Sequence, residues 1–261
     1  NKVPSGKYSY EIVATDKAGN RTVKTLKDIV LDDRVAKVYV TQELDAFSPN
    51  DDGEKDEQLF SIRANIEDGI ESWSFFIKNV KDESDDKAFY LHKESSEALP
   101  KTLKWDGKID NIVQEGSFIA ELEVRYTKGD VVKTDTSEFL SCITAPKLGV
   151  RLKPKYFSPD NDGIDDDLFI KLEAITQVGI DSWTFDISEP VETGGKRFWS
   201  TGGKGKIAEE MIWDGRSYKG EVVQSATDYP FTFTVKDSLG LSSTIKGYIP
   251  VDILIIRDGD K

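Results

Sequence analysis

The feature of this 261-residue chain that most constrains its fold is an internal repeat at an offset of 110 residues. Residues Phe47–Ile77 align without a gap with Phe157–Ile187, and 13 of the 31 aligned positions are identical. The shared positions include Phe-Ser-Pro, a following Asp-Gly, and the pattern Gly-Ile-x-Ser-Trp-x-Phe-x-Ile. Repetition on this scale predicts several copies of one module, each with its own hydrophobic core.

The repeat extends beyond this segment. Trp105-Asp106-Gly107 recurs as Trp213-Asp214-Gly215, and residues 6–15 align with residues 116–125. A unit of this length exceeds solenoid repeats of roughly 20–50 residues and approaches the roughly 100 residues of an immunoglobulin sandwich. We therefore expect an all-β chain of tandem immunoglobulin-like β-sandwich modules in an elongated arrangement.

Alternating hydrophobic residues predict the strands of these modules. First strands are expected at residues 36–42 and 149–153, and no segment has a strong helical period. A late strand is predicted in each copy by apolar residues two positions apart: Tyr8, Tyr10 and Ile12; Phe118, Ala120, Leu122 and Val124; Tyr229, Phe231, Phe233 and Val235. Residues 16–20, 127–130 and 237–240 contain the Gly or Asn that a hairpin turn requires.

The repeat also predicts the organisation of the chain. Residues 1–35 are expected to be the closing hairpin of a preceding module, residues 36–146 and 147–250 to be two immunoglobulin-like modules, and residues 251–261 to begin a linker or a following domain. The connections near residues 32–36 and 144–147 are short. We expect them to restrict the movement of one module against the next, because only long flexible linkers decouple neighbouring domains.

Composition excludes several classes of function. The chain has 48 acidic and 35 basic residues and a net charge of −13, so nucleic acid and anionic lipid surfaces are not expected partners. No apolar run approaches the roughly 20 residues of a membrane-spanning helix, and we expect no transmembrane segment. The single cysteine, Cys142, cannot form an internal disulfide and is expected to be a small buried hydrophobic residue.

The strongest candidates for a binding site are two acidic loops, residues 48–56 and 158–166. Their oxygen-bearing residues resemble the first half of a calcium loop, in which alternate positions supply ligands and a glycine permits a sharp turn. The candidate ligands are Asn50, Asp52, Asp56, Asp160, Asp162 and Asp166. A calcium loop of this kind ends with a bidentate Glu, but that position is Leu59 in the first loop and Phe169 in the second. A structural turn, with carboxylates capping backbone amides, is the other interpretation, and the sequence leaves both open.

No enzyme signature is complete. The only histidine, His92, has no nucleophile motif beside it, and residues 201–207 resemble a phosphate-binding loop without its first glycine or its final hydroxyl. The latter segment is expected to be a flexible hairpin tip. Trp105 and Trp213 invite a sugar-stacking interpretation, but recurrence before an Asp-Gly turn favours core tryptophans. The chain is expected not to be an enzyme.

Together these motifs resemble a known family. The order Phe-Ser-Pro, Asp-Gly, alternating aromatic strand, Trp-Asp-Gly and Gly-containing hairpin is similar to bacterial FlgD-type immunoglobulin-like modules and to gliding-motility-associated C-terminal domains. The resemblance covers residues 47–140 and 157–249. The chain departs from the family pattern at Asp51, where Gly is usual, and at residues 228–230, which lack the usual Gly-x-Tyr.

The resemblance implies a non-catalytic spacer or scaffold of a bacterial cell-envelope protein, periplasmic or at the cell surface. Residues 251–261 resemble the strand that leads into OmpA-like domains, so the expected partners are other envelope proteins, or peptidoglycan through a neighbouring domain. The alternative is a calcium-dependent adhesin or glycan-binding surface module. A third hypothesis is an accessory region of a hydrolase.

Overall fold

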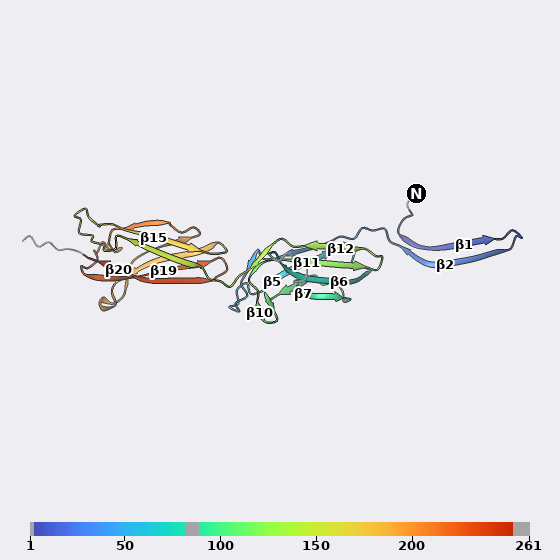
Figure 1. Cartoon of the computed structure of the whole chain (residues 1–261), viewed down its shortest axis with the longest axis horizontal. Coiled ribbons are helices and arrows are strands. Elements are labelled where there is room, and N and C mark those ends of the chain that lie inside the picture. The colour runs from blue at the N-terminus through green and yellow to red at the C-terminus, as the bar shows by residue number, and fades with distance from the viewer. Residues whose placement is uncertain (1–2, 82–88, 253–261) are drawn as a thin grey trace, which may run out of the picture. The chain divides into compact units, whose positions relative to one another are not determined.

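The structure is a computed structural model that describes residues 3–81 and 89–252, except for the side chain of Tyr90. In this part of the chain almost all regular structure is β-strand, and the one helical element is a single 3-10 turn, η2 (Val191–Thr193). Figure 1 shows the antiparallel strands and their connecting loops. The expected all-β fold is confirmed. Most of the segment 251–261, in which a lead-in strand was predicted, lies outside the described residues.

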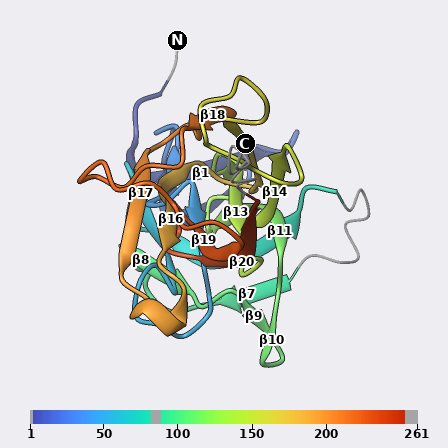
Figure 2. The same ribbon diagram turned by 90° about the vertical axis from the view of Figure 1, so that its left-hand side faces the viewer.

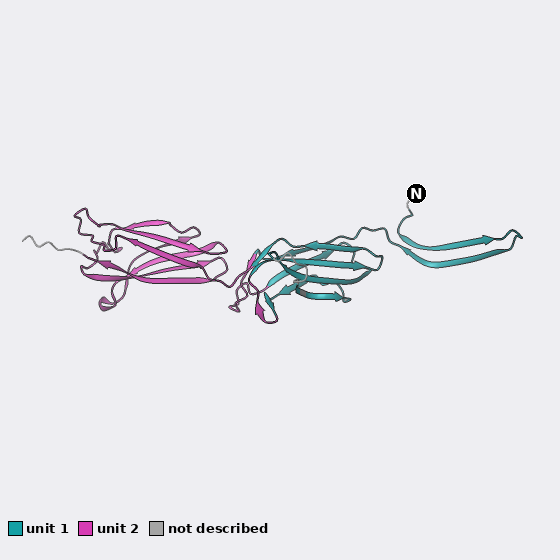
Figure 3. Cartoon of the chain, in the orientation of Figure 1, with its two compact units in different colours: residues 1–45, 58–109, 116–140 teal, residues 46–57, 110–115, 141–261 magenta. Residues whose placement is uncertain are grey.

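The chain divides into two compact units (Figure 3). One contains residues 1–45, 58–109 and 116–140, and the other contains residues 46–57, 110–115 and 141–261. This division does not test the module boundaries expected from the repeat, which stay a prediction.

The first element is a hairpin of β1 (Gly6–Thr15) and β2 (Arg21–Leu31), which form a two-stranded antiparallel sheet. Its turn was predicted at residues 16–20. The Asp16 carboxylate accepts the backbone N–H groups of Ala18 and Asn20 at 2.8 and 2.9 Å, and Gly19 has a φ of 90°. The turn therefore combines an aspartate cap with a glycine in the left-handed region.

Two sheets follow in the first sandwich. The smaller has the order β3 (Val38–Gln42), β5 (Gln58–Ala64), β8 (Thr102–Trp105). The larger has the order β4 (Ala46–Phe47), β13 (Phe139–Ser141), β11 (Gly116–Tyr126), β6 (Ile70–Asn79), β7 (Phe89–Ser95), with β12 (Val131–Asp135) also paired to β11. A small ribbon joins β9 (Lys108–Ile109) and β10 (Ile112–Val113).

The second sandwich repeats this arrangement. Its three-stranded sheet has the order β14 (Lys147–Lys153), β15 (Leu168–Ile175), β18 (Glu210–Trp213). Its four-stranded sheet has the order β17 (Arg197–Lys204), β16 (Ile180–Ser188), β19 (Thr227–Asp237), β20 (Ser242–Val251). These four strands also lie next to one another in Figure 2.

The strand order identifies the fold as immunoglobulin-like. In the second sandwich the first, second and fifth strands form one sheet, and the third, sixth and seventh strands belong to the other. In the first sandwich β3, β5 and β8 correspond to the first set, and β6, β11 and the segment of β12 and β13 correspond to the second. This is the division of the immunoglobulin sandwich, except that the fourth strand, β7 or β17, pairs with the third strand instead of the fifth. The expected tandem immunoglobulin-like modules are therefore present.

The repeated hydrophobic pattern builds the two cores. Trp73, Phe75 and Ile77 alternate along β6 and are at most 3% exposed. Their counterparts Trp183, Phe185 and Ile187 alternate along β16 and are at most 6% exposed. Because successive side chains of a strand point to opposite faces, this spacing directs all three large residues of each strand into one core.

The connection before the first sandwich is held by charged groups. The Arg34 guanidinium lies 2.9 Å from the Asp32 carboxylate and 2.7 Å from that of Asp68, and the Lys128 ammonium donates a hydrogen bond to the Arg34 carbonyl. Hydrogen bonding from Arg34 lowers the pKa of Asp32 to about 2. Residues 32–34 are therefore tied to the loops that contain Asp68 and Lys128.

The expectation for residues 201–207 is wrong in part. Residues 201–204 belong to β17 and pair with β16, so they are not a free hairpin tip. A Cβ atom on Gly202 would lie 2.5 Å from the backbone oxygen of Trp183. Gly202 is thus explained by the close approach of two strands.

Candidate functional site

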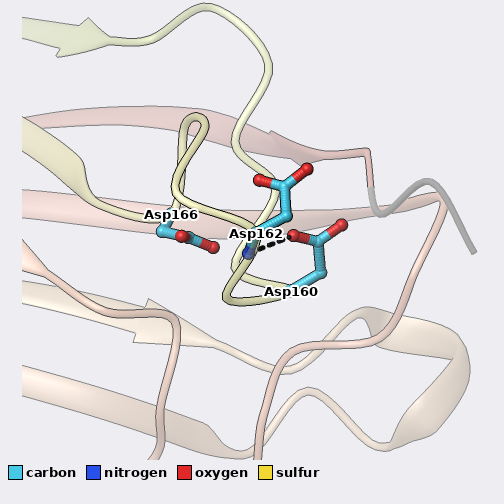
Figure 4. A group of neighbouring side chains, drawn as sticks. All are labelled: Asp160, Asp162 and Asp166. Carbon is cyan, nitrogen blue, oxygen red and sulfur yellow. Dashed lines mark hydrogen bonds between the residues drawn. The ribbon is translucent and has the colours of Figure 1, made fainter.

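The acidic loop of the second sandwich joins β14 to β15 and brings three carboxylates together. One ligand oxygen each of Asp160, Asp162 and Asp166 lies within 4.8 Å of the others. Figure 4 shows the three neighbouring side chains on this loop. Asp160 and Asp162 are exposed and Asp166 is half-buried. The structure therefore places together the three residues that the calcium-loop pattern selected here.

Backbone amides already use part of this oxygen set. Both oxygens of Asp166 accept a backbone N–H, from Asn161 at 2.6 Å and from Gly163 at 2.8 Å. One oxygen of Asp160 accepts the N–H of Asp162 at 3.1 Å, and one oxygen of Asp162 accepts the N–H of Ile164 at 2.8 Å. These bonds are those expected of a capped structural turn, and they leave Oδ2 of Asp160 and Oδ2 of Asp162 without a hydrogen bond from the described residues.

The equivalent loop of the first sandwich has the same pattern of positive φ angles. Positive φ angles occur at Asp51, Gly53 and Lys55 in the first loop, with values of 62°, 91° and 55°. The matching positions of the second loop, Asn161, Gly163 and Asp165, have 67°, 91° and 56°. Asp51 therefore adopts the left-handed conformation that glycine would supply more easily, at a cost of roughly 1–2 kcal/mol.

The side-chain hydrogen bonds of the first loop differ from those of the second at Asn50. The Asn50 amide donates a hydrogen bond to Oδ2 of Asp52 at 2.9 Å, while the other Asp52 oxygen accepts the N–H of Glu54 at 2.8 Å. Hydrogen bonds to its carboxylate lower the pKa of Asp52, and the bond from the Glu54 N–H has a larger effect than the bond from the Asn50 amide. The Asp56 carboxylate accepts backbone N–H groups with both oxygens, at 2.7–3.1 Å. The first loop thus satisfies internally an oxygen that the second loop leaves available.

The two Trp-Asp-Gly motifs are core elements. Trp105 and Trp213 are 1% and 2% exposed. Each indole N–H donates to a carbonyl three residues later, Lys108 at 3.1 Å and Arg216 at 3.0 Å. A tryptophan buried with its N–H satisfied cannot stack on a sugar, so the expectation of core tryptophans is confirmed.

The sequence did not show that the two motifs of a module meet. Gly215, with a φ of 75°, closes the Trp-Asp-Gly turn of the second sandwich. A Cβ atom at this position would lie 2.7 Å from Pro159 and 3.0 Å from the ring of Phe157, both in the Phe-Ser-Pro segment. The glycine therefore sits under the start of the acidic loop and helps to hold it on the core.

The two other residues considered for chemistry, His92 and Cys142, contact or lie among core residues. The His92 ring lies on β7 beside Trp73, with 5.1 Å between ring centroids. Cys142 is 1% exposed, and burial raises the pKa of its thiol, as expected of a small buried hydrophobic residue.

Comparison with known proteins finds distant likenesses among solved structures. No family model and no curated protein matches the chain. One of these structures is the tetra-tandem repeat in the extending region of a large adhesion protein. The alignment covers 95% of this chain and 57% of the adhesion-protein chain, with 13% identity and a TM-score of 0.36. Another is the fibronectin(III)-like modules of CbhA from Clostridium thermocellum. The alignment covers 85% of this chain and 99% of the CbhA chain, with 14% identity and a TM-score of 0.32.

A third solved structure comes from a 1.5-MDa bacterial ice-binding adhesin. The alignment covers 85% of this chain and 67% of the adhesin chain, with 11% identity and a TM-score of 0.42. This chain thus spans little more than half of the first of the three structures. Because these TM-scores are below 0.5, the assignment of the fold rests on the sheets and strand order of this chain.

Within residues 3–81 and 89–252, no helix is long and apolar enough to span a membrane.

Proposed function

We propose that this chain is a non-catalytic spacer or scaffold of a bacterial cell-envelope protein, in the periplasm or at the cell surface. Its tandem immunoglobulin-like modules connect or present a neighbouring domain, and partners such as peptidoglycan are met through that domain. The observation that carries the proposal is the use of every repeated motif for folding. Trp-Asp-Gly and Trp-x-Phe-x-Ile fill the cores, while Phe-Ser-Pro and the acidic residues shape turns.

The charge of the chain supports the same proposal. A net charge of −13 favours solubility of a surface exposed along several modules and disfavours binding to other polyanions. The Arg34 contacts with Asp32 and Asp68 limit the freedom of one connection. A spacer needs connections that do not collapse, and these contacts support that requirement.

Small-angle X-ray scattering of the 261-residue chain tests the spacer proposal. A single globule of this length has a radius of gyration of about 18 Å. We expect a value well above this, because modules in an elongated arrangement place mass far from the centre. A value near that of the globule would contradict the elongated arrangement and with it the spacer function.

A second candidate function, calcium binding, is favoured by the carboxylates of Asp160, Asp162 and Asp166. Calcium takes six to eight oxygen ligands, and oxygens of these three side chains lie within 4.8 Å of one another. Asp160 and Asp162 each retain an oxygen for a cation, whereas Asp166 would share oxygens already bonded to amides. Bound calcium would supply electrostatic stiffening of this loop, as required of a calcium-dependent adhesin or surface module.

Isothermal titration calorimetry of calcium into chelator-treated protein tests this second function. If the second loop binds calcium, we expect one site, abolished by Asp162→Asn, since that change removes a charge and an available oxygen. The matched variant Asp52→Asn should leave the site intact, because both Asp52 oxygens already accept hydrogen bonds within its own loop. Absence of heat, with unchanged thermal melting, would leave both loops as structural turns.

A further inference from the structure

The hairpin of β1 and β2 presents an apolar face that nothing in the described part of the chain covers. Alternation along the two strands places Tyr8, Tyr10, Ile12, Ala14, Leu26, Ile29 and Leu31 on this face, with Thr22 and Lys24 at its turn end. Tyr10, Ile12 and Leu26 are 60%, 54% and 64% exposed. Among the described residues β1 pairs with β2 alone, so its other edge is unpaired. An isolated two-stranded hairpin is marginally stable in water, and an unpaired strand edge is a template for pairing with a further strand.

The equivalent hairpin of the second sandwich shows what this face is. At an offset of 221 residues, Tyr8, Tyr10, Ile12 and Ala14 fall on Tyr229, Phe231, Phe233 and Val235 of β19. These four counterparts are between 0% and 6% exposed. The exposed positions of β1 are therefore core positions of the sandwich in the copy where the sandwich is complete.

The turns of the two hairpins match in detail. Asp16 caps the N–H groups of Ala18 and Asn20, and Asp237 caps those of Leu239 and Leu241 at 2.9 and 3.0 Å. The glycines that follow, Gly19 and Gly240, have φ angles of 90° and 91°.

The pairing register is also the same from the turn to the middle of the hairpin. Tyr10 faces Leu26, and Ile12 faces Lys24. In β19 and β20 the same positions are Phe231 facing Gly247 and Phe233 facing Ile245. An irregularity in β1 and β2 appears only beyond this stretch, between Tyr8 and Tyr10. Sequence, turn and register thus agree that β1 and β2 are the sixth and seventh strands of an immunoglobulin-like sandwich.

The structure of the second sandwich also shows what covers such a pair. Strand β16 runs antiparallel to β19, with Trp183 facing Val235, Phe185 facing Phe233 and Ile187 facing Phe231. Residues of β14, β15 and β18 pack from the opposite sheet onto the same core. The partner of a sixth-and-seventh pair is therefore a strand with the pattern Trp-x-Phe-x-Ile, backed by a three-stranded sheet.

We infer that the β1–β2 face binds the first five strands of a further module of this repeat, on the N-terminal side of this hairpin. Its third strand pairs antiparallel with the free edge of β1 and places its Trp, Phe and Ile against Ala14, Ile12 and Tyr10. This inference deepens the proposed function by naming what the first hairpin joins, and it rests on the modular architecture of that proposal.

A fusion that supplies these strands tests the inference. Residues 147–226, which contain β14 to β18, are placed directly before residue 6 of the chain, so that Gly6 takes the position of Thr227. This donor is chosen because Tyr10 then occupies the space of Phe231, an aromatic residue, whereas in the first sandwich the position holds Ala120. We expect amide hydrogen exchange of β1 and β2, followed by mass spectrometry, to slow by 100-fold or more relative to the parent chain.

A matched control fusion carries Phe185→Asp in the added copy alone and should restore fast exchange in β1 and β2. A reciprocal variant, in which residues 6–31 replace residues 227–252, guards against a fusion that does not fold. In this variant we expect the grafted strands to be protected and the second sandwich to unfold cooperatively.

Unprotected hairpin amides in both the fusion and the reciprocal variant would overturn the inference. Protection of β1 and β2 in the parent chain together with a dimer in sedimentation would also overturn it, since the occupant would then be a second copy. Scattering of the parent chain tests the spacer function separately, so failure of one result does not imply failure of the other.

Discussion

Replacement of Trp213 by alanine is expected to lower the free energy of unfolding of the second sandwich by about 3–5 kcal/mol. The side chain is 2% exposed and packs near the rings of Phe157 and Phe198, at centroid distances of 5.5 and 6.2 Å. Its removal creates a cavity and also leaves the Arg216 carbonyl without the indole donor. Urea unfolding followed by circular dichroism measures the loss, and the transition of the first sandwich should remain unchanged.

Ile212→Ala is the matched control for this prediction. Ile212 precedes Trp213 on β18, but it is 59% exposed and its side chain points to the opposite face. We expect its free energy of unfolding to change by no more than about 0.5 kcal/mol. A stable Trp213→Ala protein that had lost affinity for a polysaccharide would instead assign the tryptophan to a binding site and contradict its role in the core.

The repeat predicted most of the fold because period-2 alternation and turn chemistry are local signals. The late strands, their hairpin turns and the buried Trp-x-Phe-x-Ile segments follow directly from residues a few positions apart. Gln58 shows where this reasoning ends. It aligns with Leu168 and is fully buried. Its side-chain NH2 donates to the Leu44 carbonyl at 2.6 Å, and its side-chain oxygen accepts the Leu44 N–H at 3.0 Å. Composition classes it as polar and exposed, and only its tertiary partner explains its burial.

The candidate site was predicted to a similar depth. The sequence selected both acidic loops and both interpretations of them, since oxygen spacing and glycine position are visible in one dimension. It could not show that the Asn50 amide occupies an Asp52 oxygen, because an Asn at this position was read as one more oxygen ligand. The distinction between the loops therefore depends on which side-chain atom faces which neighbour.

Gly215→Ala is expected to lower the free energy of unfolding of the second sandwich by about 2–4 kcal/mol. The φ of 75° is unfavourable for alanine by roughly 1–2 kcal/mol. The new Cβ would lie 2.7 Å from Pro159 and 3.0 Å from Phe157, and such overpacking typically costs a further 1–3 kcal/mol. A gain of roughly 0.4–1 kcal/mol from the stiffer unfolded chain offsets part of this loss.

Gly205→Ala separates the two causes. Gly205 has a similar φ of 70°, but a Cβ atom there would have no neighbour within 4 Å. Its loss should therefore be limited to the backbone contribution of about 1 kcal/mol, measured by the same urea unfolding. Because Gly215 packs under the segment that leads into Asp160, the Gly215→Ala protein should also show faster amide exchange across residues 157–166, while the Gly205→Ala protein should not. Equal losses in the two variants would mean that backbone strain alone explains the glycine of the Trp-Asp-Gly motif, and that its contact with Phe-Ser-Pro does not couple the two motifs.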